Sequence, residues 1–445
     1  MKLVTKLSGA AVGLGLAMAA AAPAWAQAAA AAAAPTVNKG DTAWMMTSTL
    51  LVLMMIVPGL ALFYGGLVRT KNMLSVMTQV GAVACLTMLI WVMWGYSEAF
   101  GDGGNAVIAS FSKAFLHGVS ASTTSATFTA GVAIPEYVFI CFQMTFAAIT
   151  VALVLGSVVE RLKFSAVMVF GAVWLTIVYF PIAHMVWGAN GFFLTRGALD
   201  FAGGTVVHIN SGVSALVACL MLGKRIGYPT ERMAPHSLTM TGIGTGLLWV
   251  GWFGFNAGSA LEANGSAGLA MINTFVATAS AGLFWMLAER LNGHKGSALG
   301  FCSGIVAGLV AVTPAAGNSG PFGAIVLGAI AAFVCYFAVT VLKPKLGYDD
   351  ALDTFGVHGI GGMIGAMGTG VVYSAALGGP SPAGWSMGHQ VLVQLETVVT
   401  TIVWAAVGTA IAITIAKLVT GLRVSEEVER EGLDLGEHGE RAYNY

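Results

Sequence analysis

Apolar residues run through most of this chain in long blocks that polar residues interrupt only briefly. A helix needs about 20 mostly apolar residues to cross a hydrocarbon core about 30 Å thick. Eleven blocks approach or exceed this length, and they predict an all-α polytopic membrane protein. The expected spans are 44–68, 73–97, 135–159, 164–187, 200–222, 237–261, 268–288, 297–313, 321–342, 354–375 and 388–418.

Composition supports one membrane domain rather than several soluble ones. Hydrophobic residues make up 57% of the chain and charged residues 9%, against about 25% charged in soluble domains. The formal net charge is zero, so the basic footprint of a nucleic-acid-binding protein is absent. No CxxC pair occurs, which favours packing roles over disulfides or a metal cage for Cys85, Cys141, Cys219, Cys302 and Cys335.

The N-terminal 26 residues are typical of a signal peptide. A basic start at Lys2 and Lys6 precedes an apolar run and the A-x-A signal that ends at Ala26. An uncleaved first membrane helix is the alternative. We expect an Ala-rich, disordered linker over 27–43, a membrane domain over 44–422 and a charged, soluble tail over 423–445.

Basic residues predict the orientation of the spans. Cytoplasmic loops of membrane proteins carry the excess of Lys and Arg. Three basic residues fall in predicted outer segments: Lys39, Lys113 and Arg196. Fifteen fall inside, which places the tail in the cytoplasm: Arg69, Lys71, Arg161, Lys163, Lys224, Arg225, Arg232, Arg290, Lys295, Lys343, Lys345, Lys417, Arg423, Arg430 and Arg441.

The first ten spans divide into two sets of five, followed by one C-terminal helix. Because five is odd, the second set enters the membrane with the opposite orientation. Such inverted repeats are common in transporters, whose substrate sites lie near the midplane between the halves. We therefore expect a five-plus-five inverted repeat with a central site.

Two histidines occupy matching places in these halves. His208 lies in VVHINSG and His358 in GVHGIGG, and a glycine follows each by four residues, Gly212 and Gly362. An ionisable side chain at membrane depth is costly and indicates a functional site. His208 lies eight residues into its span, about 12 Å deep at 1.5 Å per residue. His358 lies at least five residues into a span that enters from the opposite face. Both histidines therefore approach the midplane. A metal pair and two independent, structural histidines are the alternatives.

Aromatic residues and one serine form a candidate cation site near this path. A cation is attracted to aromatic faces, and a hydroxyl can accept its hydrogen bond. Taken singly, each aromatic residue is more often a packing residue or an interface anchor. The candidates are Phe142, Phe146, Trp187, Trp252, Phe255 and Ser259.

Asp200 opens the fifth span in LDFAGGTVVH. A carboxylate there suits a helix N-terminus as a cap and electrostatically. Asp200 either stabilises the helix N-terminus alone or also positions the outer entrance of the path. His184, near the outer end of the fourth span, is interpreted as a packing residue.

Several long motifs resemble those of the ammonium transporter family (Amt/Mep/Rh), in its bacterial Amt branch. The resemblance covers residues from about 40 to 445. It is carried by ALFYGGLVRTKN, FQMTFAAIT, LDFAGGTVVHIN, GWFGFNAGSA, DTFGVHGIGG and the tail SEEVEREGLDLGEHGERAYN. One additional residue lies between Trp187 and Asp200, which alters the outer loop rather than the pore.

The resemblance implies an eleven-helix protomer in a homotrimer, with one pore per protomer and no cofactor. It also implies a PII-type nitrogen-regulatory protein (GlnK type) as a partner of the tail. Position by position, the resemblance assigns the external ammonium site to Trp187, Phe146 and Ser259, with Phe142 beside them. It assigns the gate to Phe146 and Phe255, and the pore to His208 and His358. Asp200 corresponds to the acidic residue that supports the vestibule and takes part in deprotonation.

These residue types suit ammonium uptake. A bare cation is far costlier than neutral ammonia in an apolar path, so ammonium, or its analogue methylammonium, would be bound outside, deprotonated and conducted as ammonia. Neutral imidazoles can donate and accept hydrogen bonds along the way. A sensor or receptor on the same scaffold is the alternative. An intramembrane enzyme is disfavoured because no serine, carboxylate pair or metal-ligand set accompanies the histidines.

Overall fold

The structure, a computed structural model, describes residues 35–443, and within them eleven helical segments are long and apolar enough to cross a membrane. The expected span count and fold class are confirmed. In chain order the spans are α2 (Lys39–Met54) with η1 (Met55–Leu60) and α3 (Ala61–Leu67); η2 (Thr70–Asn72) with α4 (Met73–Ile90), η3 (Trp91–Gly95) and α5 (Tyr96–Phe100); α6 (Glu136–Leu155); α7 (Phe164–Trp174) with η5 (Leu175–Tyr179), α8 (Phe180–Trp187) and α9 (Phe192–Thr195); η6 (Gly204–Ile209) with α10 (Asn210–Leu222); α11 (Leu238–Gly258); α12 (Gly265–Leu291); α13 (Ala298–Val312) with η7 (Thr313–Ala315); α14 (Pro321–Phe337) with η8 (Ala338–Leu342) and α15 (Lys343–Leu346); η9 (Phe355–Gly359) with α16 (Ile360–Val372); and α17 (Met387–Thr420).

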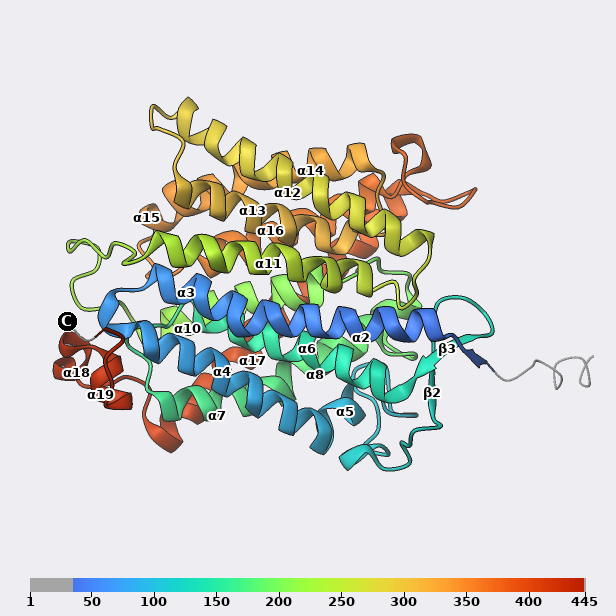
Figure 1. The fold of residues 1–445 in the computed structure, drawn as a ribbon, viewed down its shortest axis with the longest axis horizontal. Helices are drawn as coiled ribbons and strands as arrows, with labels where there is room; N and C mark the ends of the chain where they lie inside the picture. Colours follow the sequence, from blue (N-terminus) through green and yellow to red (C-terminus); the bar gives the residue numbers. More distant parts are fainter. Residues whose placement is uncertain (1–34, 444–445) are drawn as a thin grey trace, which may run out of the picture.

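The spans run side by side along the long axis of the molecule (Figure 1). At one end, which we call the sheet end, β1 (Thr36–Val37) pairs in parallel with β3 (Val132–Pro135), and β2 (Thr124–Ala126) pairs antiparallel with β3. At the opposite end, the tail end, lie α18 (Glu426–Glu431) and α19 (Leu433–His438). Two short turns, η4 (Ala114–Leu116) and η10 (Ala375–Leu377), lie in loops.

The start of the first span differs from the expected boundary. Helix α2 begins at Lys39, and the Asn38 side chain accepts a hydrogen bond from the Asp41 amide. This is an N-cap, which supplies one of the acceptors that a first helical turn lacks. Strand β1 and this cap therefore order the last part of the predicted linker. The predicted signal peptide lies outside the described residues.

The charged tail packs against the helical bundle. Leu433 is fully buried. Asp434 Oδ1 accepts a hydrogen bond from the Ser75 amide at 2.8 Å, and Glu437 Oε2 accepts one from the Phe164 amide at 2.7 Å. Both amides lie in first helical turns, where backbone donors lack intrahelical partners. The tail thus caps α4 and α7, a contact that its charged sequence did not predict.

The two histidine-bearing spans cross at close quarters. Each begins with a π-helical segment, η6 for His208 and η9 for His358. Gly212 faces the Gly359 backbone so closely that a Cβ atom would clash with it, and a Cβ on Gly362 would lie 3.0 Å from His208 Cβ. The glycine that follows each histidine by four residues therefore lets the two backbones meet.

Candidate functional site

The two histidines meet in the centre of the bundle. Their Nδ1 atoms are 3.3 Å apart and their ring centroids 5.3 Å apart, with the rings nearly parallel. His208 is 1% exposed and His358 5%. At this distance one Nδ1 donates a hydrogen bond and the other accepts it, so at least one imidazole is neutral. The structure therefore brings together the pair that the sequence singled out.

No metal-binding arrangement surrounds the pair. Among residues 35–443, no group of three or more His, Cys, Asp or Glu side chains is placed to hold a metal ion. The groups around His208 are instead aromatic: the indole of Trp252 stacks on it at 5.4 Å, and the Phe255 ring lies 6.1 Å away.

A stacked phenyl pair separates the histidines from the sheet end. The Phe146 and Phe255 rings are 4.1 Å apart and 17° from parallel. Both side chains are buried. A small void on the histidine side of this pair is lined by Phe255, Trp252, His208 and His358. The phenyl pair thus lies at the end of a narrow path that leads past the histidines.

Further aromatic residues surround the other side of the phenyl pair. Trp187 packs edge-on against Phe146 at 5.8 Å, and Phe142 lies 4.9 Å from Phe146. Ser259, 9% exposed, uses its hydroxyl proton to donate to the Phe255 carbonyl at 2.8 Å. Its oxygen lone pairs remain able to accept a hydrogen bond.

Trp252 belongs to the histidine side of the path. The sequence grouped it with Ser259 in one motif, seven residues apart. Seven residues of helix rise about 10 Å, and the phenyl pair lies between the two positions. Trp252 also donates its indole hydrogen to Thr313 Oγ1 at 2.9 Å. It therefore borders the path beside His208, away from Trp187.

Asp200 is a helix cap and a support for Trp187. Its two carboxylate oxygens accept four backbone hydrogen bonds at 2.6–3.1 Å, and its carbonyl accepts the Trp187 indole hydrogen at 2.9 Å. Burial raises its pKa, although the four donors act in the opposite direction. The donors come from the first turn of the His208 span, namely Gly203, Gly204, Thr205 and Val206.

A second aspartate of this kind, Asp350, was missed by the sequence interpretation. Its Oδ2 accepts a hydrogen bond from the Phe355 amide at 2.7 Å, at the start of the His358 span. Burial raises its pKa to about 6. The signal was present: Asp350 precedes His358 by eight residues, as Asp200 precedes His208. The two caps follow the inverted repeat.

On the tail-end side, an open cavity reaches His358. Its volume is ≈ 420 Å³. Apolar and polar side chains from both halves of the chain line it, among them Phe63, Tyr64, Trp285, Glu289, Lys343 and His358. The path is thus wide at the tail end, narrow at the histidines and closed at the phenyl pair.

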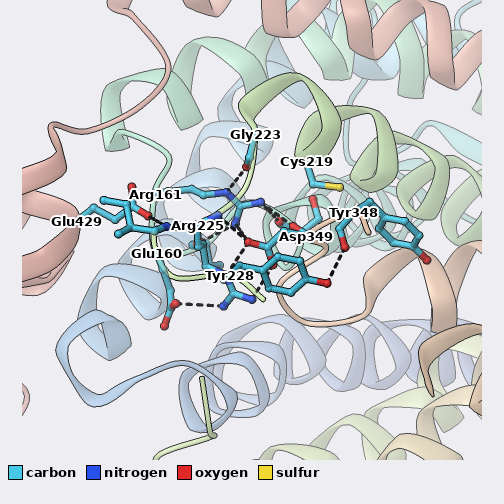
Figure 2. Close-up of polar contacts among 12 residues, drawn as sticks. Glu160, Arg161, Cys219, Gly223, Arg225, Tyr228, Tyr348, Asp349 and Glu429 are labelled. Atoms are coloured by element: carbon cyan, nitrogen blue, oxygen red, sulfur yellow. Dashed lines mark hydrogen bonds and ion pairs between the residues drawn. The ribbon is translucent and has the colours of Figure 1, made fainter. Parts of the chain in front are cut away.

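A buried ion network lies beside the tail-end cavity, which Arg225 helps to line (Figure 2). Arg225 pairs with Asp349 at 2.7 Å and with Glu160 at 3.1 Å, and Arg69 also pairs with Glu160. Burial opposes ionisation of Glu160, but the charges of Arg225 and Arg69 lower its pKa overall. Glu429 of the tail accepts a hydrogen bond from the Ile226 amide. The sequence used these arginines only to orient the spans.

Known proteins resemble this chain over most of its length. A sequence model of the Ammonium Transporter Family matches residues 43–443. The chain is 48% identical over 409 residues to an ammonium transporter of Aquifex aeolicus (92% of this chain, 94% of that one), and 44% identical over 406 residues to one of Bacillus subtilis (91% and 98%).

Solved structures share the fold. The structure of Candida albicans Mep2 matches with a TM-score of 0.79 and 35% identity, over 88% of this chain and 87% of that one. The structure of a sensor Amt protein matches with a TM-score of 0.82 and 28% identity, over 89% and 98%.

Proposed function

Since the chain belongs to the ammonium transporter family, we propose that it takes up ammonium across a bacterial cytoplasmic membrane. The sheet end faces outward and the tail end faces the cytoplasm. The fifteen-to-three distribution of basic residues supports this orientation. The N-terminus that follows the signal peptide then lies outside.

Ammonium is captured at the sheet end of the phenyl pair. Trp187 and Phe146 offer aromatic faces to the cation, and the Ser259 oxygen accepts one of its hydrogen bonds. These contacts replace part of the hydration shell before the ion reaches the apolar path. Asp200 holds Trp187 in place through its backbone carbonyl.

Ammonia is the species that crosses the narrow section. Burying an unpaired cation is far costlier than burying a neutral polar molecule, so ammonium transfers a proton to water on the sheet-end side of the phenyl pair and continues as ammonia. The phenyl rings, 4.1 Å apart, must tilt to let ammonia pass. The histidine pair then offers both donor and acceptor atoms in an otherwise apolar path. Potassium has no proton to lose and is excluded.

The observation that carries this proposal is the contact between His208 and His358, between the closed phenyl pair and the tail-end cavity. Purified protein in liposomes should take up labelled methylammonium and exclude potassium. Uptake no greater than in empty liposomes would refute transport. The current that follows an ammonium pulse reports whether net charge moves.

A sensor of ammonium is the second candidate, because one matching structure is that of a sensor Amt protein. Binding without flux in the same liposomes would favour it. The higher identity to proteins named ammonium transporters supports transport.

Two partners complete the proposal. A homotrimer would cover part of the exposed apolar surface of the outer spans, among them spans six, seven, nine and eleven, and mass measurement in detergent tests it. A PII-type regulatory protein (GlnK type) would bind at the tail end and block the path when nitrogen is plentiful. Co-purification that is unchanged by deletion of residues 424–445 would argue against a role for the tail.

A further inference from the structure

His184 is held by two hydrogen-bond acceptors at once. It lies in the last turn of α8, one turn before Trp187, and is 2% exposed. Its Nδ1 is 2.8 Å from the Ala99 carbonyl oxygen, and its Nε2 is 2.8 Å from the Asn105 carbonyl oxygen. A backbone carbonyl oxygen accepts hydrogen bonds and cannot donate them.

Only one protonation state satisfies both contacts. A neutral imidazole carries one N–H and one lone pair, so one of its nitrogens would face a carbonyl oxygen lone pair to lone pair at 2.8 Å. With both nitrogens protonated, both contacts are charge-assisted hydrogen bonds. We infer that His184 is an imidazolium cation, which fastens the loop after α5 to the end of α8 and thereby positions Trp187.

The surroundings suit a positive charge. The C-terminal turn of a helix stabilises a cation, because the helix dipole is negative there. Helix α5 packs against α8 and carries the buried carboxyl group of Glu98, whose Oε2 has no hydrogen-bond partner within residues 35–443. The other ionisable groups on the neighbouring elements are Tyr96 on α5, Tyr179 on η5, His208 on η6, Glu136 on α6, Asp102 in the loop with Lys113, which pairs with both carboxylates, and Arg196 and Asp200 after α9.

The contrast with the pore histidines is informative. His208 and His358 face each other through Nδ1 atoms, so one of them must accept and hence be neutral. His184 faces only acceptors. One side-chain type therefore serves two electrostatic purposes in the same protein.

The two hydrogen bonds of His184 restrain Trp187 through the backbone. The Gly188 amide donates to the His184 carbonyl at 2.8 Å, and the Phe192 amide donates to the Ala106 carbonyl, in the loop that His184 holds, at 2.9 Å. The loop after α5 and the last turn of α8 thus hold the segment that directly follows Trp187. The consequence for ammonium capture rests on the proposed function, whereas the charge of His184 does not.

The charge is measured directly by solid-state NMR. Protein labelled with ¹⁵N-histidine is reconstituted in lipid bilayers at neutral pH, and the ring signals of His184 are identified by their loss in His184→Gln. Seven other histidines serve as internal references. Two N–H signals from the His184 ring are expected. One N–H signal and one unprotonated nitrogen would overturn the inference, whether or not the protein transports ammonium.

The positioning role is measured on matched variants. His184→Gln keeps donors without the charge, His184→Phe keeps a ring without donors, and His117→Gln alters an exposed histidine of the same outer region. Loss of the two His184 hydrogen bonds should raise the KM for methylammonium by about three- to tenfold, which corresponds to the free energy of one net hydrogen bond. The increase should be larger in His184→Phe than in His184→Gln. The KM of His117→Gln should be unchanged.

Amide hydrogen exchange supplies a readout independent of transport. Exchange over residues 101–110 should accelerate in both His184 variants and stay constant in His117→Gln. Unchanged exchange together with unchanged KM in assembled His184 variants would refute the positioning role. If the variants do not assemble, the NMR measurement on the unmodified protein still decides the charge.

Discussion

Replacing Asp200 by asparagine tests whether this carboxylate acts by holding the His208 span. Its four accepted hydrogen bonds come from consecutive backbone amides, two on each oxygen. Asparagine has one oxygen, so it keeps two of these bonds. Its amide group then points at the two remaining N–H donors, which are buried and lose their acceptor.

The magnitude follows from this count. A buried donor left without a partner costs about 1–3 kcal/mol, so Asp200→Asn should destabilise the protein by about 2–6 kcal/mol, and Asp200→Ala by more. Because the same turn carries the Trp187 contact, methylammonium uptake should fall in the same order. Thermal unfolding in detergent and initial uptake rates in liposomes measure the two effects.

Asp350→Asn is the matched control. Asp350 accepts the Phe355 amide hydrogen through Oδ2, and its Oδ1 has no partner within residues 35–443, so asparagine can keep its oxygen at the Oδ2 position and should cost less than about 1 kcal/mol. Equal destabilisation by Asp200→Asn and Asp350→Asn would refute the reasoning from hydrogen-bond counts.

The stability of the Asp350→Asn control should also depend on pH differently from that of the unmodified protein. Burial raises the pKa of Asp350 from 3.8 to about 6. A carboxyl group with a raised pKa contributes stability that is complete below its unfolded pKa and is lost as pH rises through the folded value. Asp350 should therefore lower the stability of the unmodified protein between about pH 4 and pH 6, and Asp350→Asn should lack this contribution when the two pH profiles are compared.

Three further outcomes are expected. His208→Asp or His358→Glu places a negative partner in the path and should admit potassium; variants that conduct ammonium and still exclude potassium would refute the conduit. Ser259→Ala and Trp187→Leu should weaken capture by a few-fold to about thirtyfold, as cation–π terms of about 0.5–2 kcal/mol imply, in concentration-dependent uptake. A reporter fused after Arg423 should be active only as a cytoplasmic reporter, and its export would overturn the assigned orientation.

Much of the fold and the central site followed from the sequence, because lipid imposes simple rules. A membrane span must be apolar, so the eleven blocks could be recognised in the sequence. Burying an ionisable residue inside a span costs free energy, so such a residue indicates a function. This is why His208 and His358 were identified before the structure showed their contact. Asp350 escaped notice because a carboxylate at the end of a span reads as an ordinary surface group.

The packing of the tail against the spans was not predicted for a related reason. Alternating charges normally indicate solvent exposure, yet Glu429, Asp434 and Glu437 each accept a backbone hydrogen bond from a span end or loop. Sequence shows a carboxylate but not the amide that it will meet several hundred residues away. Trp252 shows the same limit, since its motif does not reveal which side of the phenyl pair it occupies.

The capping of α4 and α7 by the tail sets an order of assembly. Ser75 receives its acceptor from a residue 359 positions later, and Phe164 from one 273 positions later. At about 5–20 residues per second, these two spans wait tens of seconds after their own synthesis for the caps that complete them. The segment that finishes the second and fourth spans is thus synthesised after all eleven spans. A chain that stops before Asp434 carries eleven spans but leaves two helix ends open, which makes the tail a structural mark that synthesis has passed the last span.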